Sequence, residues 1–193
     1  MSRIVVIGGT GFAGSAIVAE AASRGHEVIA FSRSAPDEPV AGVDYVQGDA
    51  TDEAALRSVV SGADVVVAAL APRGPLAAPF REVTRTIARL ADAEGARLFV
   101  VGGYSSLRPA PGAPRGIEDL PAAPETLDWV FVSPALAFGS HVPGEQTGEY
   151  RLGDDVALSP EDGGDISAPD YALGLVDLIE ADDHHRVQVN LAH

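Results

Sequence analysis

The chain has 193 residues, of which 46% are hydrophobic and 21% are charged, and this composition is typical of one soluble globular domain. The absence of cysteine excludes disulfides, thiolate nucleophiles, cysteine-ligated zinc and iron–sulfur clusters. All 13 basic residues are arginine, which excludes Schiff-base chemistry, a Walker-type phosphate lysine and a Tyr-x-x-x-Lys catalytic pair.

The net charge of −15 is unevenly distributed along the chain. Residues 1–116 are nearly neutral, whereas residues 117–193 contain 16 acidic residues against Arg151 and Arg186 alone. Nucleic acid and anionic membranes would repel such a chain, so we expect neither as a partner. A solvated acidic surface is the simpler interpretation. The alternative is an acidic pocket mouth that selects cationic substrates.

The chain carries no recognisable targeting segment. The apolar run that follows Arg3 is too short for the core of a signal peptide. No segment reaches the roughly 18 apolar residues of a membrane span. We therefore expect a cytoplasmic protein.

Short β-branched runs alternate with longer Ala-rich segments over the first two-thirds of the chain. Strands are expected at Arg3–Ile7, 27–31, 43–46, 64–70 and Arg97–Val101. Helices are expected at 13–24, closed by Gly25, at 52–61, capped by Thr51, and at 76–94. Apolar strands without alternation, separated by helices, predict a parallel sheet covered on both faces.

The pattern changes after Val101. Residues 102–124 contain four Gly and five Pro, so we expect no regular helix there. A sixth strand is expected at 129–132, followed by a hairpin at 150–158, a helix at 169–180 and a last strand at 186–191.

The segment Gly8-Gly9-Thr10-Gly11-Phe12-Ala13-Gly14 follows the first strand and opens the first helix. Gly8 permits a tight turn, Gly11 lets a pyrophosphate approach the backbone, and Gly14 lets the helix pack close to the strand. The N-terminus of the helix offers free N–H groups and a positive dipole to the phosphates. The motif predicts dinucleotide binding; the alternative is a glycine-rich turn in a domain that has lost its ligand.

The end of the second strand distinguishes NAD from NADP, because an acidic residue there would bind the ribose 2′-hydroxyl. Here Ser32 and Arg33 follow Phe31, and Arg33 can pair with a 2′-phosphate. NADP(H) is therefore favoured over NAD(H), although Asp37 and Glu38 follow closely. The alternative is a solvated Arg33.

Two further strand ends are predicted to meet the cofactor. After the third strand, Asp49 can accept a hydrogen bond from the adenine amino group or cap the turn into the next helix, with Ala50 beside it. After the fourth strand, small residues leave room for the ribose and nicotinamide, although they are also expected where helices pack on strands: Ala69, Leu70 and Ala71.

Together these motifs resemble the atypical short-chain dehydrogenases/reductases. The branch is that of the NAD(P)H-binding, NmrA-like proteins, often named as NADH–flavin reductases. Beyond the glycine loop and Arg33, the resemblance rests on Gly48-Asp49, Val100-Val101-Gly102-Gly103 and three C-terminal segments, 129–135, 143–153 and 166–172. It covers nearly the whole chain, and Gly-Glu-Tyr-Arg-Leu-Gly at 148–153 is its most specific part.

The resemblance implies an α/β Rossmann fold, with a doubly wound parallel sheet, that binds NAD(P), often with a flavin or another planar acceptor above the nicotinamide. Residues 1–193 would form one domain, with the cofactor-binding part at 1–116 and a small substrate-side part at 117–193. The pyrophosphate would be held by Gly8, Thr10, Gly11, Phe12 and Gly14. The adenosine side would meet Ser32, Arg33, Asp49 and Ala50. The nicotinamide side would meet Ala69, Leu70, Ala71, Gly103, Pro134 and Ala135.

One departure from the family concerns the segment between Gly103 and Trp129. Relatives carry a full helix there, which holds the Tyr-x-x-x-Lys pair in conventional members, and this chain has too few residues for it. The wall of the cofactor site is then open or filled by a partner chain. A monomer and a homodimer are both compatible with the sequence.

The candidate catalytic residues are Tyr104, Ser105 and Ser106, because they follow the fifth strand at the edge where open α/β sheets bind ligands. A serine hydroxyl there could orient a substrate oxygen; the alternative is that the serines only satisfy loop backbone. Tyr104 and Arg108 have Tyr-x-x-x-Arg spacing, which we interpret as coincidental because arginine stays protonated. Tyr150 either packs over the substrate or belongs to a hairpin core. The scattered histidines predict no metal site.

The sequence therefore predicts an NAD(P)H-dependent oxidoreductase that reduces a flavin, a quinone or a similar conjugated small molecule by direct hydride transfer. Two alternatives stay open. One is a regulatory protein that senses NADP without turnover. The other is a non-redox enzyme on the same fold, such as a cyclase or isomerase.

Overall fold

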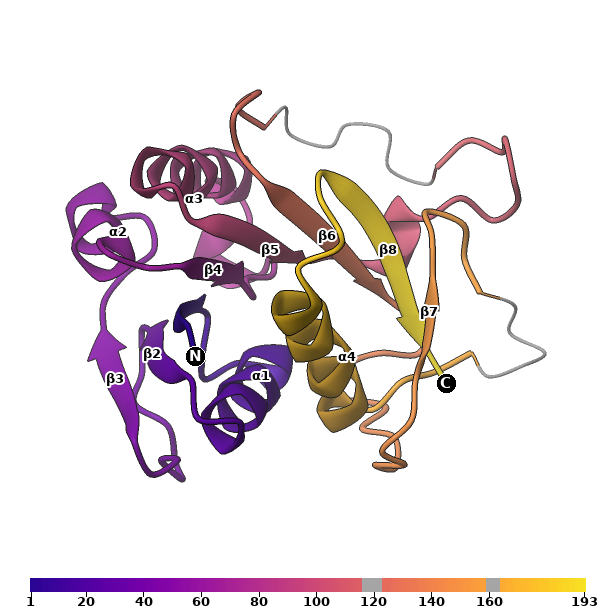
Figure 1. Ribbon diagram of the computed structural model, residues 1–193, viewed down its shortest axis with the longest axis horizontal. Coiled ribbons are helices and arrows are strands. Elements are labelled where there is room, and N and C mark those ends of the chain that lie inside the picture. The colour runs from indigo at the N-terminus through magenta and orange to yellow at the C-terminus, as the bar shows by residue number, and fades with distance from the viewer. Residues whose placement is uncertain (116–122, 159–163) are drawn as a thin grey trace.

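The computed structural model describes residues 1–115, 123–158 and 164–193. Within these ranges eight strands form one sheet, in the order β3-β2-β1-β4-β5-β6-β8-β7 (Figure 1). The strands are β1 (Arg3–Ile7), β2 (Glu27–Ser32), β3 (Val43–Gln47), β4 (Val65–Ala68), β5 (Arg97–Val101), β6 (Trp129–Pro134), β7 (Arg151–Gly153) and β8 (Val187–Ala192). Neighbouring strands from β3 through β8 are parallel, and β7 is antiparallel to β8.

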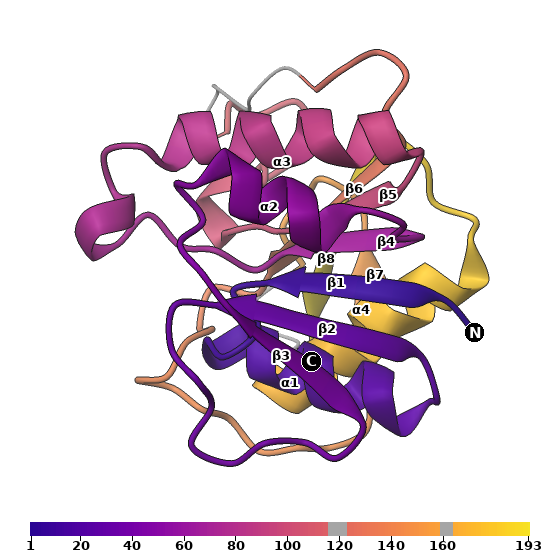
Figure 2. The ribbon, with the colours of Figure 1, turned by 90° about the vertical axis from the view of Figure 1, so that its left-hand side faces the viewer.

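Helices cover both faces of this sheet. They are α1 (Phe12–Ser23), α2 (Glu53–Val60), α3 (Phe80–Glu94) and α4 (Ala168–Ala181), with short 3₁₀ turns η1 (Gly74–Leu76) and η2 (Tyr104–Ser106). Figure 2 shows α2 and α3 above the sheet and α1 and α4 below it. The predicted doubly wound, Rossmann-like α/β fold is confirmed.

The core forms two layers because successive strand residues face opposite sides. Ile4 and Val6 pack with α1 and α4, whereas Val5 and Ile7 pack with α2 and α3, and all four are fully buried. Burial on both faces explains why the strand sequences are continuously apolar.

Two predicted helix boundaries are wrong. The N-cap of α2 is Asp52 instead of Thr51, because the Asp52 carboxylate accepts hydrogen bonds from the backbone N–H groups of Ala54 (2.9 Å) and Ala55 (3.3 Å). The helix predicted at 76–94 begins only at Phe80, after η1. Pro79 accounts for this start, because proline disfavours helical backbone in the residue before it.

The predicted hairpin at 150–158 is also wrong. Residues 151–153 pair with β8, where Leu152 lies opposite Leu191. The chain then turns away, and Val156 forms an isolated parallel bridge with Arg108. The Asp155 carboxylate draws this segment toward two arginines, Arg108 at 3.0 Å and Arg115 at 2.5 Å.

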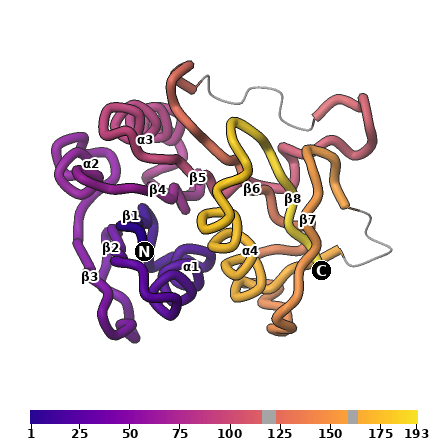
Figure 3. The backbone as a smooth tube through the Cα atoms, viewed as in Figure 1, coloured from indigo at the N-terminus to yellow at the C-terminus, as the bar shows by residue number. Residues whose placement is uncertain are grey.

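The described parts of the connection between Gly103 and Trp129, residues 104–115 and 123–128, contain η2 and no α-helix. Figure 3 shows that the chain from β6 to its C-terminus lies on the opposite side of the molecule from β2 and β3, with α4 beside α1.

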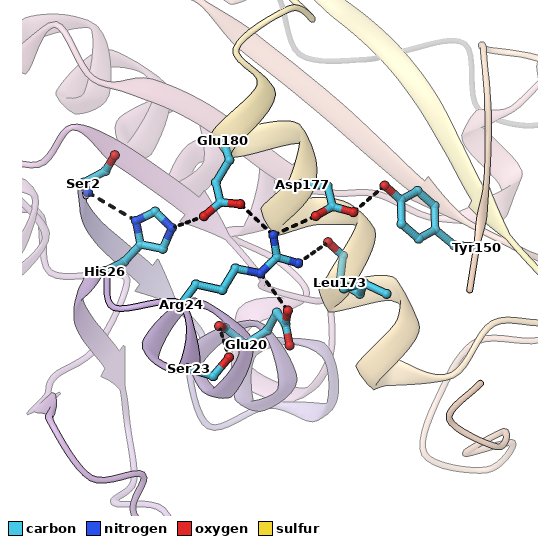
Figure 4. Close-up of polar contacts among 9 residues, drawn as sticks. All are labelled: Ser2, Glu20, Ser23, Arg24, His26, Tyr150, Leu173, Asp177 and Glu180. Carbon is cyan, nitrogen blue, oxygen red and sulfur yellow. Dashed lines mark hydrogen bonds and ion pairs between the residues drawn. The ribbon is translucent and has the colours of Figure 1, made fainter. Parts of the chain in front are cut away.

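An ion cluster joins the C-terminal ends of α1 and α4 (Figure 4). The Arg24 guanidinium donates to Glu20 at 2.8 Å and to Asp177 and Glu180 at 2.7 Å each. The Tyr150 hydroxyl donates to Asp177 at 2.6 Å, and burial together with this carboxylate raises the pKa of Tyr150 to about 12. Tyr150 therefore fastens its segment to α4, a role different from either of the two predicted for it.

Candidate active site

The glycine loop between β1 and α1 is fixed by its backbone. The N–H groups of Gly8 and Gly9 both donate to the carbonyl oxygen of Phe31, at 2.8 and 3.2 Å, which ties the loop to the end of β2. Gly8 has a φ of 92°, a conformation that favours glycine. A Cβ atom on Gly14 would lie 2.1 Å from the Gly8 oxygen, so only glycine lets α1 start this close to the loop.

The first turn of α1 is open to an anion. Gly11 is the N-cap, no described side chain caps the turn, and the turn contains no acidic residue. Its N–H groups and the helix dipole therefore face the carboxyl edge of the sheet without internal compensation. A Cβ atom on Gly11 would lie 3.2 Å from Gly8 O, a tight contact, so glycine keeps the approach to the helix end clear. These features fit a dinucleotide pyrophosphate.

Thr10 and Phe12 flank this opening. The Phe12 ring packs edge-on against Phe138, with the centroids 5.2 Å apart, and Phe138 in turn lies 4.7 Å from Tyr171. The Tyr171 hydroxyl is buried and donates to Val132 O at 2.8 Å. The half-buried Phe12 ring is thus held by Phe138, which leaves the Phe12 backbone N–H free to face the phosphates. The sequence analysis missed Phe138, because nothing local marks a ring that packs across the chain.

On the adenosine side, Arg33 is exposed after β2, and Ser32 donates its hydroxyl to Ser34 O at 2.9 Å. The Asp49 carboxylate accepts from both the N–H and the hydroxyl of Thr51, at 2.8 Å each. These two bonds, with a smaller contribution from Arg33, lower the pKa of Asp49. Asp49 therefore forms the turn before α2, one of its two predicted roles, and stays charged near Arg33.

A hollow of about 190 Å³ lies beside this region, between the first turns of α2 and α3. It is lined by Ala50, Thr51, Glu53, Pro79, Glu82, Val83 and Thr86. A larger hollow of about 350 Å³ lies at the opposite, amino edge of the sheet, near Asp92 and Asp128. The smaller hollow is the one that adjoins the glycine-loop edge.

On the nicotinamide side, Ala69 and Leu70 are half-buried and Ala71 is exposed. Ala69 supports the glycine loop directly, because a Cβ atom on Gly8 would lie 2.4 Å from its carbonyl oxygen. Pro134 and Ala135, at the end of β6, are buried. Gly103, at the end of β5, is exposed. The small residues predicted for this side therefore lie at the ends of three strands, β4, β5 and β6, along one edge of the sheet.

The three candidate catalytic residues differ in their surroundings. Tyr104 is half-buried and Ser105 is exposed. Ser106 is 3% exposed, and its hydroxyl donates to Gly103 O at 2.6 Å. Arg108 pairs with Asp155 and donates to Ala113 O at 2.7 Å, so its charge is compensated away from Tyr104.

The described residues contain no group of three or more acidic or histidine side chains arranged to hold a metal. Within the same residues, no helix has the length and apolar character needed to cross a membrane.

Comparison with known proteins also indicates a nucleotide cofactor. The family model for NAD(P)H-binding proteins matches residues 8–182. The chain belongs to this family. It is 31% identical over 209 residues to the uncharacterized protein YwnB of Bacillus subtilis (strain 168), and the match covers 94% of each protein. The predicted membership of the NAD(P)H-binding, NmrA-like branch of the atypical short-chain dehydrogenases/reductases is confirmed.

Solved structures give the same result. The "putative NADH-flavin reductase" of Streptococcus pneumoniae TIGR4 shares 30% identity with a TM-score of 0.84, covering 100% of both chains. The "putative epimerase" of Bacteroides thetaiotaomicron also has 30% identity and a TM-score of 0.84, over 100% of this chain and 97% of that one. A short-chain dehydrogenase/reductase of Veillonella parvula, solved with NADP, shares the fold at 14% identity and a TM-score of 0.73. The fold and the family are those of NAD(P)H-binding proteins.

Proposed function

We propose that this protein is a reductase that uses NADPH in preference to NADH and passes a hydride to a flavin, a quinone or a similar conjugated acceptor. The observation that carries the proposal is the combination of an open glycine cradle with the absence of a proton relay in the described residues. Lysine is missing from the whole chain, and the arginine nearest in spacing to Tyr104 is paired with Asp155.

The preference for NADPH rests on the end of β2. No carboxylate occupies the last residue of β2 or the next position, where a ribose 2′-hydroxyl would be bound, and Arg33 is exposed there. A guanidinium can bind a 2′-phosphate with two parallel hydrogen bonds.

The glycine loop and the first turn of α1 would hold the pyrophosphate, and the small residues at the ends of β4, β5 and β6 would border the nicotinamide. Bound NADPH supplies the hydride. Ser105, exposed next to Gly103, would orient a polar atom of the acceptor. Tyr104, half-buried beside it, would border the acceptor ring.

The acceptor class follows from the missing relay. A simple carbonyl requires a positioned acid as negative charge develops on its oxygen. A flavin or quinone spreads that charge over a conjugated ring and can take its proton from water. In this division of roles, residues 1–116 bind most of the cofactor and also supply Tyr104 and Ser105 to the acceptor. Residues 117–193 form the rest of the acceptor side, where the acidic surface disfavours anionic acceptors, and border the nicotinamide only at the end of β6.

Steady-state oxidation of NADPH and of NADH against a panel of riboflavin, FMN and uncharged quinones tests the proposal. We expect turnover above the protein-free rate for at least one acceptor, and faster with NADPH. Tight NADPH binding without turnover on any acceptor would contradict it and favour a redox sensor. Conversion of a substrate without any cofactor would favour a non-redox enzyme.

A further inference from the structure

The last strand carries two buried polar side chains in an otherwise apolar sequence. In β8, Gln188 and Asn190 are 9% and 1% exposed, and they alternate with Val189 and Leu191, which pack in the α1 and α4 layer. Gln188 and Asn190 therefore face the other side of the sheet, toward the connection between β5 and β6. This alternation is visible in the sequence, yet its partners lie far away along the chain.

Gln188 reaches the turn that follows β5. Its Nε2 lies 3.1 Å from Ser106 O and 3.0 Å from both Ser106 Oγ and Ser133 Oγ, and its two protons are shared among these three acceptors. The amide orientation is fixed, because a backbone carbonyl oxygen only accepts and must face the NH₂ group. One side chain of β8 thus joins the ends of β5 and β6.

The protons in this network have a single consistent arrangement. The Ser106 hydroxyl gives its one proton to Gly103 O at 2.6 Å. In its 3.0 Å contact with Ser133, Ser106 Oγ therefore accepts and the Ser133 hydroxyl donates. With both hydroxyl protons used inside the protein, Ser106 has none to give to a substrate, and its predicted role as a catalytic donor is disfavoured.

The network ends on Gly103, which borders the proposed nicotinamide site and begins the turn that carries Tyr104 and Ser105. Gln188 Oε1 is buried and has no hydrogen-bond partner among the described residues. A buried unpaired carbonyl destabilises a fold, whereas an apolar side chain of similar size would fill the space without that penalty. The hydrogen bonds that the Gln188 NH₂ group donates to Ser106 and Ser133 are then the feature that an apolar residue at position 188 could not supply.

We propose that Gln188 is a positioning residue for the nicotinamide end of the site. Through Ser106 and Ser133 it sets the Gly103 carbonyl and the turn bearing Tyr104 and Ser105. This inference rests on the proposed function, because it assumes NADPH in the site. The test measures binding, so it does not depend on whether the protein turns over an acceptor. Because Gln188 acts on one end of the cofactor only, its loss should separate binding of the two halves of NADPH.

The experiment compares NADPH with 2′-phospho-ADP-ribose, which keeps the adenosine, the 2′-phosphate and the pyrophosphate but lacks nicotinamide. Dissociation constants are measured by titration calorimetry for the wild type and Gln188→Leu. We expect NADPH affinity to fall about tenfold and 2′-phospho-ADP-ribose affinity to change less than about twofold. The reason is that a misplaced turn at Gly103 would disturb contacts with the nicotinamide end, which 2′-phospho-ADP-ribose lacks. Ser106→Ala removes the bond to Gly103 O and should give the same pattern, which also covers the case that Gln188→Leu does not fold.

Arg24→Met is the control, because it removes partly exposed ion pairs at the opposite edge of the sheet and should lower stability without changing the ratio of the two affinities. An unchanged ratio in Gln188→Leu and Ser106→Ala would overturn the proposal, whether both affinities stay constant or both fall together. If the wild type binds NADPH but reduces no acceptor, the proposed reaction fails while the ratio still decides the role of Gln188.

Discussion

Gly14 and Gly8 stand so close that a Cβ atom on Gly14 would lie 2.1 Å from the Gly8 carbonyl oxygen. The start of α1 is therefore pressed against the loop that ends β1. The same closeness points the first turn of the helix at the carboxyl edge of the sheet. The binding geometry and the packing of α1 thus depend on the same contact.

The contact predicts the effect of Gly14→Ala. The added methyl group must push α1 away from the loop, so we expect a loss of about 1–3 kcal/mol in the free energy of unfolding, together with weaker NADPH binding. Urea denaturation and a thermal shift with NADPH measure the two effects. Ser15→Ala is the control, since Ser15 is exposed on the same turn. Wild-type stability in Gly14→Ala would contradict the close packing.

Gly11 tests binding with less packing strain than Gly14. Gly11→Asp places a carboxylate where the pyrophosphate would lie, at an exposed residue whose Cβ atom would lie 3.2 Å from Gly8 O, against 2.1 Å for Gly14. We expect the thermal shift with NADPH to disappear while the melting temperature of the free protein stays close to the wild-type value. Ser23→Asp adds the same charge at the far end of α1 and should leave the shift unchanged. Undiminished binding by Gly11→Asp would overturn the cofactor assignment.

Arg33 should determine the choice between the two cofactors. A charged hydrogen bond lost from a guanidinium to a phosphate weakens binding by about tenfold or more. We expect Arg33→Ala to lose this factor for NADPH and little for NADH, as measured by titration of each cofactor. Arg57→Ala, an exposed arginine on α2, is the matched control. An equal loss for both cofactors would assign Arg33 to a contact other than the 2′-phosphate.

Asp170 predicts how stability depends on pH. Its side chain is buried at the start of α4 and accepts bonds from Ser167 Oγ, the N–H groups of Thr147 and Gly148, and His193 Nε2. Burial acts to raise the pKa of Asp170, and these hydrogen bonds outweigh it and lower the pKa to about 2. The carboxylate therefore stabilises the fold above the unfolded-state pKa near 4, and this contribution is lost as the pH falls toward 2.

The expected size is about 2 kcal/mol, from a shift of nearly two pH units at about 1.4 kcal/mol each. Asp170→Asn should be less stable than the wild type at pH 7 by at least that amount, and the difference should shrink between pH 4 and pH 2. Urea denaturation across this range measures it. Asp37→Asn, an exposed carboxylate, is the control. A constant difference between Asp170→Asn and the wild type would contradict the account.

The parts of the structure that the sequence predicted are those that depend on neighbouring residues. The run Arg3–Ile7 is apolar because both sheet faces are covered, and the glycine loop follows it directly. Two errors are local, because Asp52 caps α2 instead of Thr51 and Pro79 delays the start of α3, whereas the others involve distant partners. The pairing of Leu152 with Leu191 and the bonds from Gln188 to Ser106 and Ser133 join segments that no local periodicity relates. The sequence also could not show that the Ser106 hydroxyl donates its proton to Gly103 O, because this contact exists only in the folded turn.

The central claim is that the carboxyl edge of this sheet binds NADPH through the glycine loop and Arg33. Calorimetric titration of the wild-type protein with NADPH and with NADH tests it most directly. The account predicts one NADPH bound per chain, with an affinity about tenfold or more above that for NADH. Absence of binding by both cofactors, or tighter binding of NADH, would contradict it.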